Sequence, residues 1–110
     1  EVSWITEEIR RNPAAPHALT RYAERFGMRP EALSRLFHRQ TGENFAGYLR
    51  RKRIELACRL LLETDMPISE MAQACGYLDA KTFREAFHRV VGHAPRDYRK
   101  NHLQPFIRLI

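Results

Sequence analysis

The sequence has few of the features that mark secreted, membrane-spanning or metal-binding proteins. It contains two cysteines, Cys58 and Cys75, with no C-x-x-C pair and no cluster of cysteine and histidine at metal-ligand spacing. We expect both thiols to be free and buried, as in a reducing cytoplasm, rather than joined in a disulfide. No apolar run approaches the roughly 20 residues that a membrane span needs, and no signal peptide opens the chain. These absences predict a cytoplasmic protein with no membrane contact, no metal and no cofactor.

Alternating apolar and polar residues over a strand length are also missing, so we expect no β-sheet. What the sequence does have is positive charge, with 19 Lys and Arg against 13 Asp and Glu and a net charge of +6. At 110 residues the chain is long enough for one domain or two coupled small lobes, each of them marginal alone. A basic helical domain favours an anionic partner, and nucleic acid is the leading candidate.

The segment Leu19–Tyr48 is followed later in the chain by a second, similar copy. Gly27 pairs with Gly76 at a separation of 49 positions, and the run 37–39, Phe-His-Arg, pairs with the run 87–89 at a separation of 50. The change of separation means that the turn of the second copy is one residue longer. Two copies of a small helical unit indicate either a repeat array or a module of two lobes, and only two copies fit this chain.

Each copy has the pattern of a helix-turn-helix. Apolar residues fall on one helical face, a glycine follows at the turn, and Pro30 or the N-cap candidate Asp79 begins the second helix. The second helix of the first copy should run from about 30 to 41, and that of the second copy from about 80 to 91. The inner residues are predicted to be Leu19, Tyr22, Ala23, Phe26, Leu33, Leu36 and Phe37 in the first copy, and Ile68, Met71, Ala72, Cys75, Phe83, Ala86, Phe87 and Val90 in the second.

Three further helices complete an all-α fold of seven. A leading helix should be capped by Ser3 and stop by Pro13, and a short closing helix should run from Pro95 toward His102. Between the copies, a helix over about 44–64 has apolar residues around most of its circumference, which favours burial against more than one neighbour. We therefore expect lobe one over about 1–43, this linker helix, and lobe two over about 65–103. The apolar tail 103–110 is expected to dock on the domain, meet a partner or be partly disordered.

Two long runs of residues carry a resemblance to a known family. The second copy contains Ala72, Cys75-Gly76-Tyr77, Thr82-Phe83, Phe87, Gly92-His93-Ala94-Pro95 and Tyr98-Arg99; the first contains Leu33-Ser34-Arg35-Leu36-Phe37, Thr41-Gly42, Tyr48-Leu49, Arg53, Ala57 and Leu60-Leu61. In this order and spacing they resemble the DNA-binding domain of AraC/XylS transcription regulators, from about residue 4 to residue 100. The resemblance implies two helix-turn-helix lobes whose second helices enter successive major grooves of double-stranded DNA, and a cytoplasmic activator or repressor of bacterial transcription.

The resemblance also implies partners. Such domains usually form the C-terminal part of a longer regulator, so we expect this chain to be a fragment that lacks an N-terminal effector or dimerisation domain. RNA polymerase is a further expected partner.

Base-reading candidates are the residues opposite the inner stripes. In the two helices these are Glu31, Ser34, Arg35 and His38, and Ala80, Lys81, Arg84 and Glu85. Arg35 is the leading candidate because it occupies a base-contacting position of the family and a guanidinium can bond bidentately to guanine. Glu85 could accept from cytosine N4, although Glu31 and Glu85 could equally be solvated carboxylates paired with a neighbouring arginine. Family members carry other residues at the positions of Glu31 and Ala80, so the resemblance does not give the operator sequence.

Phosphate contacts are expected from a second group of residues: Arg50, Arg51, Lys52, Thr82 and His88. For the three basic residues a solvated helix face is an equal alternative, whereas the resemblance gives Arg53 an internal ion pair. His38 and His88 favour a phosphate or sugar contact over catalysis or metal binding. Helix N-termini at residues 30, 44, 80 and 95 are additional phosphate candidates.

Two other function classes fit the sequence less well. A helical protein-interaction domain would not need Arg35, Lys81 and Arg84 on the outward arcs of paired helices. An enzyme with a helix-turn-helix appendage, such as an alkyl-transfer DNA repair protein, would need a reactive cysteine in a polar setting, and neither cysteine is expected to be exposed. We therefore predict a DNA-binding protein that is not an enzyme.

Overall fold

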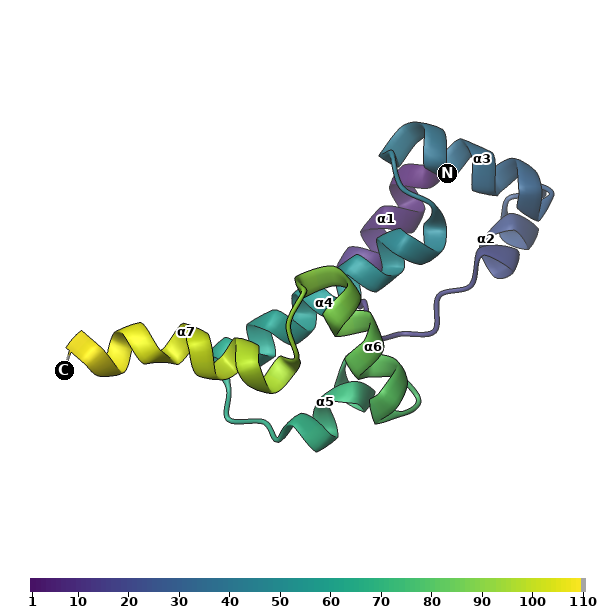
Figure 1. The fold of residues 1–110 in the computed structure, drawn as a ribbon. Coiled ribbons are helices and arrows are strands. Elements are labelled where there is room, and N and C mark those ends of the chain that lie inside the picture. Colours follow the sequence, from purple (N-terminus) through teal and green to yellow (C-terminus); the bar gives the residue numbers. More distant parts are fainter. Residues whose placement is uncertain (110) are drawn as a thin grey trace. The chain divides into compact units, whose positions relative to one another are not determined.

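The computed structural model describes the backbone of residues 1–109 and the side chains of residues 1–102. This described part has seven helices and no strand, as the sequence predicts (Figure 1). The helices are α1 (Val2–Arg11), α2 (Leu19–Arg25), α3 (Pro30–Thr41), α4 (Phe45–Glu63), α5 (Ile68–Ala74), α6 (Ala80–Val91) and α7 (Pro95–Leu109). The chain divides into two compact units, residues 1–52 and 53–110, and the division falls inside α4.

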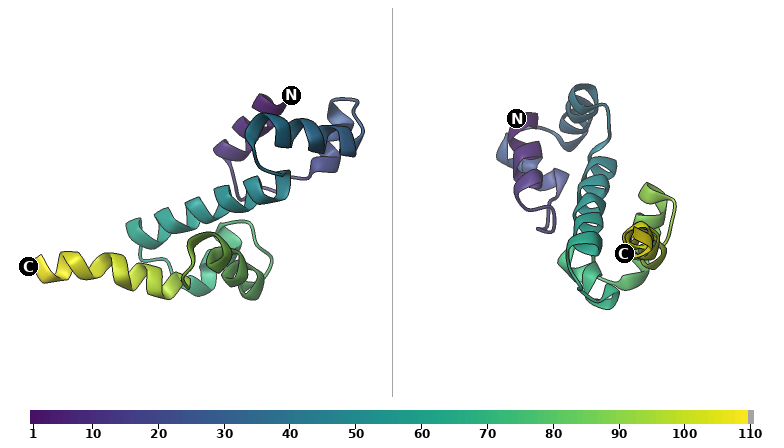
Figure 2. Two further views of the ribbon diagram at one scale, coloured as in Figure 1. Left: turned by 45° about the horizontal axis from the view of Figure 1, so that its top comes forward. Right: turned by 90° about the vertical axis from the view of Figure 1, so that its left-hand side faces the viewer.

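The core of the first unit is built by α1, α2, α3 and the first part of α4. Ala23 of α2 is almost fully buried, and its small side chain suits the contact that α2 makes with α3. Helix α1 also contacts α3, and both helices can be followed by their purple and blue colours in Figure 2. The buried residues are Val2, Ile5, Ile9, Ala23, Leu33, Phe37, Phe45 and Leu49.

The core of the second unit repeats this arrangement with the rest of α4 and helices α5, α6 and α7. Helix α5 contacts α6, and α6 contacts α7. The buried residues are Ile54, Ala57, Leu61, Met71, Ala72, Cys75, Phe83, Ala86 and Phe87. On α7, the Arg99 guanidinium donates to the carbonyl oxygens of Leu61 at 3.0 Å and Thr64 at 3.3 Å, which fastens α7 to the C-terminal end of α4.

The two helix-turn-helix copies have matching turns. After α2 the N–H of Met28 donates to the carbonyl of Ala23, and after α5 the N–H of Tyr77 donates to the carbonyl of Ala72, both at 2.8 Å. Helices α3 and α6 are each 12 residues long. Each ends at a glycine in the left-handed region, with φ 80° at Gly42 and 86° at Gly92, where a side chain would be strained.

Two local predictions about helix ends are wrong. Ser3 does not cap α1, which begins at Val2 after Glu1, because the buried Val2 side chain draws the first turn into the core. Val90 is exposed although it was assigned to the inner stripe, whereas Val91 packs against the core of the second unit. In its last turn α6 faces α7 on the Phe87 side, and this favours burial of Val91.

The closing helix is longer than the sequence predicted. Its backbone continues beyond His102 and past Pro105, ordinarily a helix-breaking residue, to Leu109. The side chains of residues 103–110 lie outside the described residues, and the expectation about the apolar tail falls there.

Candidate nucleic-acid interface

One surface on α3 carries the first group of predicted base-reading residues. Leu33 and Phe37 are fully buried, and this fixes the rotation of α3 about its axis. The opposite arc is therefore exposed, and we call it the α3 surface: Glu31, Arg35 and His38 are exposed and Ser34 is half-buried.

The polar groups of the α3 surface are not engaged within the chain. Glu31 and Arg35 stand four residues apart, but among the described residues neither forms an ion pair or a side-chain hydrogen bond. By contrast, Arg10 and Arg11 of α1 both pair with Glu7, at 2.6 and 3.3 Å. The Arg35 guanidinium thus presents its donors to solvent, as a residue that binds an external acceptor must.

The corresponding surface on α6 is positioned by a side-chain cap. The N–H of Thr82 donates to Asp79 Oδ1 at 2.7 Å, and the Thr82 hydroxyl donates to Oδ2 at 3.0 Å. These two hydrogen bonds lower the pKa of the Asp79 carboxyl. The Asp79 cap predicted from the sequence is confirmed. A phosphate contact from the Thr82 hydroxyl would have to replace its bond to Asp79.

The α6 surface is defined by Ala80, Lys81, Arg84, Glu85 and His88. All are exposed except Ala80, which is half-buried. Toward the C-terminal half of α6, the surface borders an open depression of about 570 Å³. Its lining residues are Arg84, Glu85, His88, Arg89, Ala94 and Pro95. Two arginines, a histidine and the carboxylate of Glu85 therefore surround this depression together with the first residue of α7.

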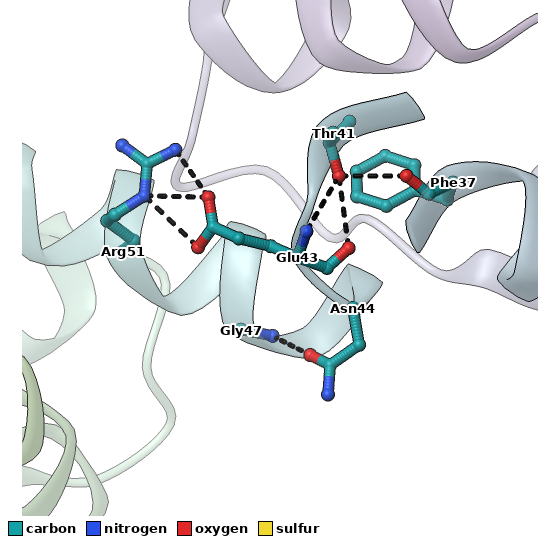
Figure 3. A network of polar contacts seen from close by, with 6 residues as sticks. All are labelled: Phe37, Thr41, Glu43, Asn44, Gly47 and Arg51. Atoms are coloured by element: carbon teal, nitrogen blue, oxygen red, sulfur yellow. Dashed lines mark hydrogen bonds and ion pairs between the residues drawn. The ribbon is translucent and has the colours of Figure 1, made fainter. Parts of the chain in front are cut away.

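The basic residues 50–53 of α4 lie in different environments. Arg50 is half-buried, and Lys52 lies over the Tyr48 ring with its Nζ 5.7 Å from the centroid. Arg51 donates to both carboxylate oxygens of Glu43, with the shortest distance 2.7 Å between Nη2 and Oε1 (Figure 3). The predicted phosphate role of Arg51 therefore has an intramolecular competitor.

The turn before α4 is held by its own polar contacts (Figure 3). The Thr41 hydroxyl lies 2.8 Å from the Phe37 carbonyl oxygen, and Asn44 Oδ1 accepts from the N–H of Gly47 at 2.7 Å. A Cβ at position 47 would lie 2.9 Å from that oxygen, so the glycine makes room for the cap.

Arg53 occupies a different setting from the rest of the basic run. It is half-buried, and its guanidinium carbon lies 5.6 Å from the centroid of the Tyr77 ring. Burial lowers the pKa of this group. The contact with Tyr77 supports the structural role expected for Arg53.

The two thiols lie in or against the core of the second unit. Cys75 is buried and Cys58 is half-buried, and neither is in a disulfide. Burial raises the pKa of both thiols, that of Cys75 to about 11. A thiol with this pKa is almost fully protonated at neutral pH and is a poor nucleophile.

The described residues hold neither a metal-binding cluster nor a helix that could cross a membrane. Among those residues, no group of three His, Cys, Asp or Glu side chains is placed to hold a metal ion. Within the same part of the chain, every helix is too short or too polar to cross a membrane.

The sequence prediction missed Leu78 and Glu43. Leu78, in the turn between α5 and α6, is 96% exposed. Its only signal in the sequence is that the second turn is one residue longer than the first. Glu43 is a short-range partner of Arg51, and an eight-residue separation across a turn has no periodic signature.

The fold and the exposed polar surfaces of α3 and α6 are those of a helix-turn-helix DNA-binding domain. A model described as a helix-turn-helix domain matches residues 22–101. The chain belongs to the AraC family of transcription regulators, which bind specific DNA sequences and are not enzymes.

Individual relatives agree with this assignment. The regulatory protein SoxS of Escherichia coli is 32% identical over 98 residues, which are 89% of this chain and 88% of SoxS. The transcriptional activator RhaR of Klebsiella pneumoniae is 36% identical over 85 residues, 77% of this chain and 30% of RhaR. The DNA-binding domain of AdpA shares the fold, with a TM-score of 0.88 at 24% identity and 94% coverage of each chain. The chain spans about a third of the length of several curated relatives that it matches.

Proposed function

We propose that α3 and α6 are the recognition helices of this domain and that they enter successive major grooves of one DNA duplex. The observation that carries this proposal is the repeated surface: two helices of equal length, each with its apolar face in a core and charged groups exposed opposite. In a helix-turn-helix the second helix lies in the major groove. AdpA, whose fold this chain shares, was crystallised with a target DNA.

The α3 and α6 surfaces are the proposed base-reading sites. Arg35 and Arg84 have exposed guanidinium groups that fit the acceptors of guanine, and Glu85 fits the amino group of cytosine. The smaller residues Ser34 and Ala80 allow the helix backbone to approach the base edges. The remaining members of the two surfaces, Glu31, His38 and Lys81, complete the proposed set.

Phosphate contacts are proposed for the residues that border these surfaces. Arg50 and Lys52 lie on α4, and His88 lines the depression beside α6. Thr82 and Arg51 belong to this set, on condition that they exchange their bonds to Asp79 and Glu43 for bonds to phosphate. Such contacts position the protein on the duplex and make its affinity depend on salt.

The wider role follows from the family. We propose that the chain is the DNA-binding part of a longer bacterial regulator with an N-terminal effector or dimerisation domain, and that the regulator acts on RNA polymerase in the cytoplasm, where bacterial DNA lies. Burial raises the pKa of both thiols, that of Cys75 to about 11, and this supports a function without cysteine catalysis.

A selection from a random duplex library tests the proposal. We expect the 110-residue chain to enrich one sequence and to bind it with a log K that falls against log salt concentration with a slope near −5, for about six phosphate contacts. A poly-anion without base sequence, such as heparin, is the control for charge alone. Absence of duplex binding at low salt and tens of micromolar protein would overturn the proposal and favour a protein-interaction domain.

A further inference from the structure

Leu78 is the residue by which the second helix-turn-helix turn exceeds the first. Between the turn glycine and the N-cap, the first copy has only Met28, whereas the second has Tyr77 and Leu78. Met28 and Tyr77 both pack against the core of their own unit. Leu78 is 96% exposed, so the extra residue contributes no packing to the fold.

The usual local role of an apolar residue at this position is also absent. A hydrophobic residue before the N-cap often packs against the fourth residue of the helix, which here is Phe83. Tyr77 occupies that place instead, with ring centroids 5.8 Å apart. Neither helix capping nor core packing therefore accounts for a leucine at position 78.

The position of Leu78 gives it access to bound DNA. It directly precedes Asp79, the N-cap of α6, and the N-terminal residues of a recognition helix are those that contact base edges. Isolated exposed leucines are common on protein surfaces, so the argument depends on this location. The groups that follow, Lys81 and Arg84, are polar and suit the hydrogen-bonding atoms of the groove.

One group in the major groove has the complementary chemistry. Thymine presents a C5-methyl group there, and apolar side chains recognise it by van der Waals contact. We propose that Leu78 contacts a thymine methyl group at the base pair beside the N-terminal end of α6, and so selects a T·A pair. This inference rests on the proposed function, because it requires α6 to lie in the major groove.

Replacement of thymine by deoxyuridine tests the contact, because it removes only the methyl group. The probe is the duplex enriched by selection with the 110-residue chain, with each thymine replaced singly. We expect one replacement to weaken binding about fourfold, the size for one buried methyl group. Leu78→Ala should weaken binding to the unmodified duplex by at least as much and lose all sensitivity to that replacement.

Leu62→Ala is the matched control, because Leu62 is also an exposed leucine, at 41%, and lies outside the helix-turn-helix turn. It should keep the wild-type sensitivity, and both variants should keep the wild-type melting temperature. The inference is overturned if Leu78→Ala remains as sensitive as wild type, or if no single replacement affects the wild type. Failure to enrich any duplex would instead overturn the proposed function, and this inference with it.

Discussion

The guanidinium of Arg51 and the carboxylate of Glu43 form a two-oxygen ion pair that links the turn after α3 to the second turn of α4. Both side chains remain partly exposed, at 38% and 34%. A half-exposed pair of this kind stabilises a fold by under about 1 kcal/mol. Its larger effect is on charge, because the carboxylate neutralises an arginine that is proposed to bind phosphate.

Glu43→Gln should release Arg51 for phosphate binding. We expect higher affinity for the selected duplex and a salt slope steeper by up to about 0.9, the value for one more neutralised phosphate. The double variant Glu43→Gln with Arg51→Ala should lose this steeper slope. A gain in affinity that persists in the double variant would show that Arg51 is not the phosphate contact. It would also show that the lost negative charge acts at long range.

Arg35→Ala should flatten base preference at one position of the selected site. The expected loss of discrimination is about 1–3 kcal/mol at that base pair, with no change in melting temperature because Arg35 is exposed. Arg39→Ala, which removes another exposed arginine from α3 near its C-terminal end, is the matched control. Repeating the selection with each variant measures the effect, and an unchanged base preference for Arg35→Ala would exclude it as a base reader.

The cap at Asp79 should make the stability of α6 depend on pH. Its hydrogen bonds hold the pKa of this carboxyl below its ordinary value of 3.8. The cap therefore contributes fully above that ordinary value, and the contribution is lost as the pH falls through the lower pKa of the folded state. The melting temperatures of the wild type and Asp79→Asn should differ most at neutral pH and become equal in acid. A difference that does not change with pH would argue against the ionised cap.

The two DNA segments contacted by α3 and α6 should lie one helical turn apart. Chemical footprinting of the selected duplex should show two protected major-groove segments about 34 Å apart. Inserting five base pairs between them moves one segment to the opposite face, and affinity should fall to that of single-helix binding. Unchanged affinity would mean that only one of α3 and α6 reads the sequence.

Periodicity predicted most of the fold because the buried residues repeat at helical spacing. Leu33 and Phe37, and their counterparts Phe83 and Phe87, were assigned to the core from spacing alone and are fully buried. The wrong predictions concern helix ends, where the outcome depends on tertiary neighbours. The spacing from Phe87 allows either Val90 or Val91 to be the next inner residue, and in the fold Val91 packs against the core.

The candidate site was predicted in outline, because a core stripe defines the arc opposite to it. Contacts between those side chains are not encoded by the helical wheel. The spacing of Glu31 and Arg35 permits an ion pair that the structure does not form, whereas Arg51 pairs with Glu43 across a turn. The exposure of Leu78 was not predicted either, because the helical wheel assigns no face to a residue in a turn.

Helices α3 and α6 have equal length, two buried positions in common and a left-handed glycine after each. The outward residues of one could be grafted onto the other without altering either core, because Leu33 and Phe37 correspond position by position to Phe83 and Phe87. Such a graft would give a domain that reads the same half-site twice. With α3 and α6 as the proposed recognition helices, specificity could therefore be redesigned one helix at a time.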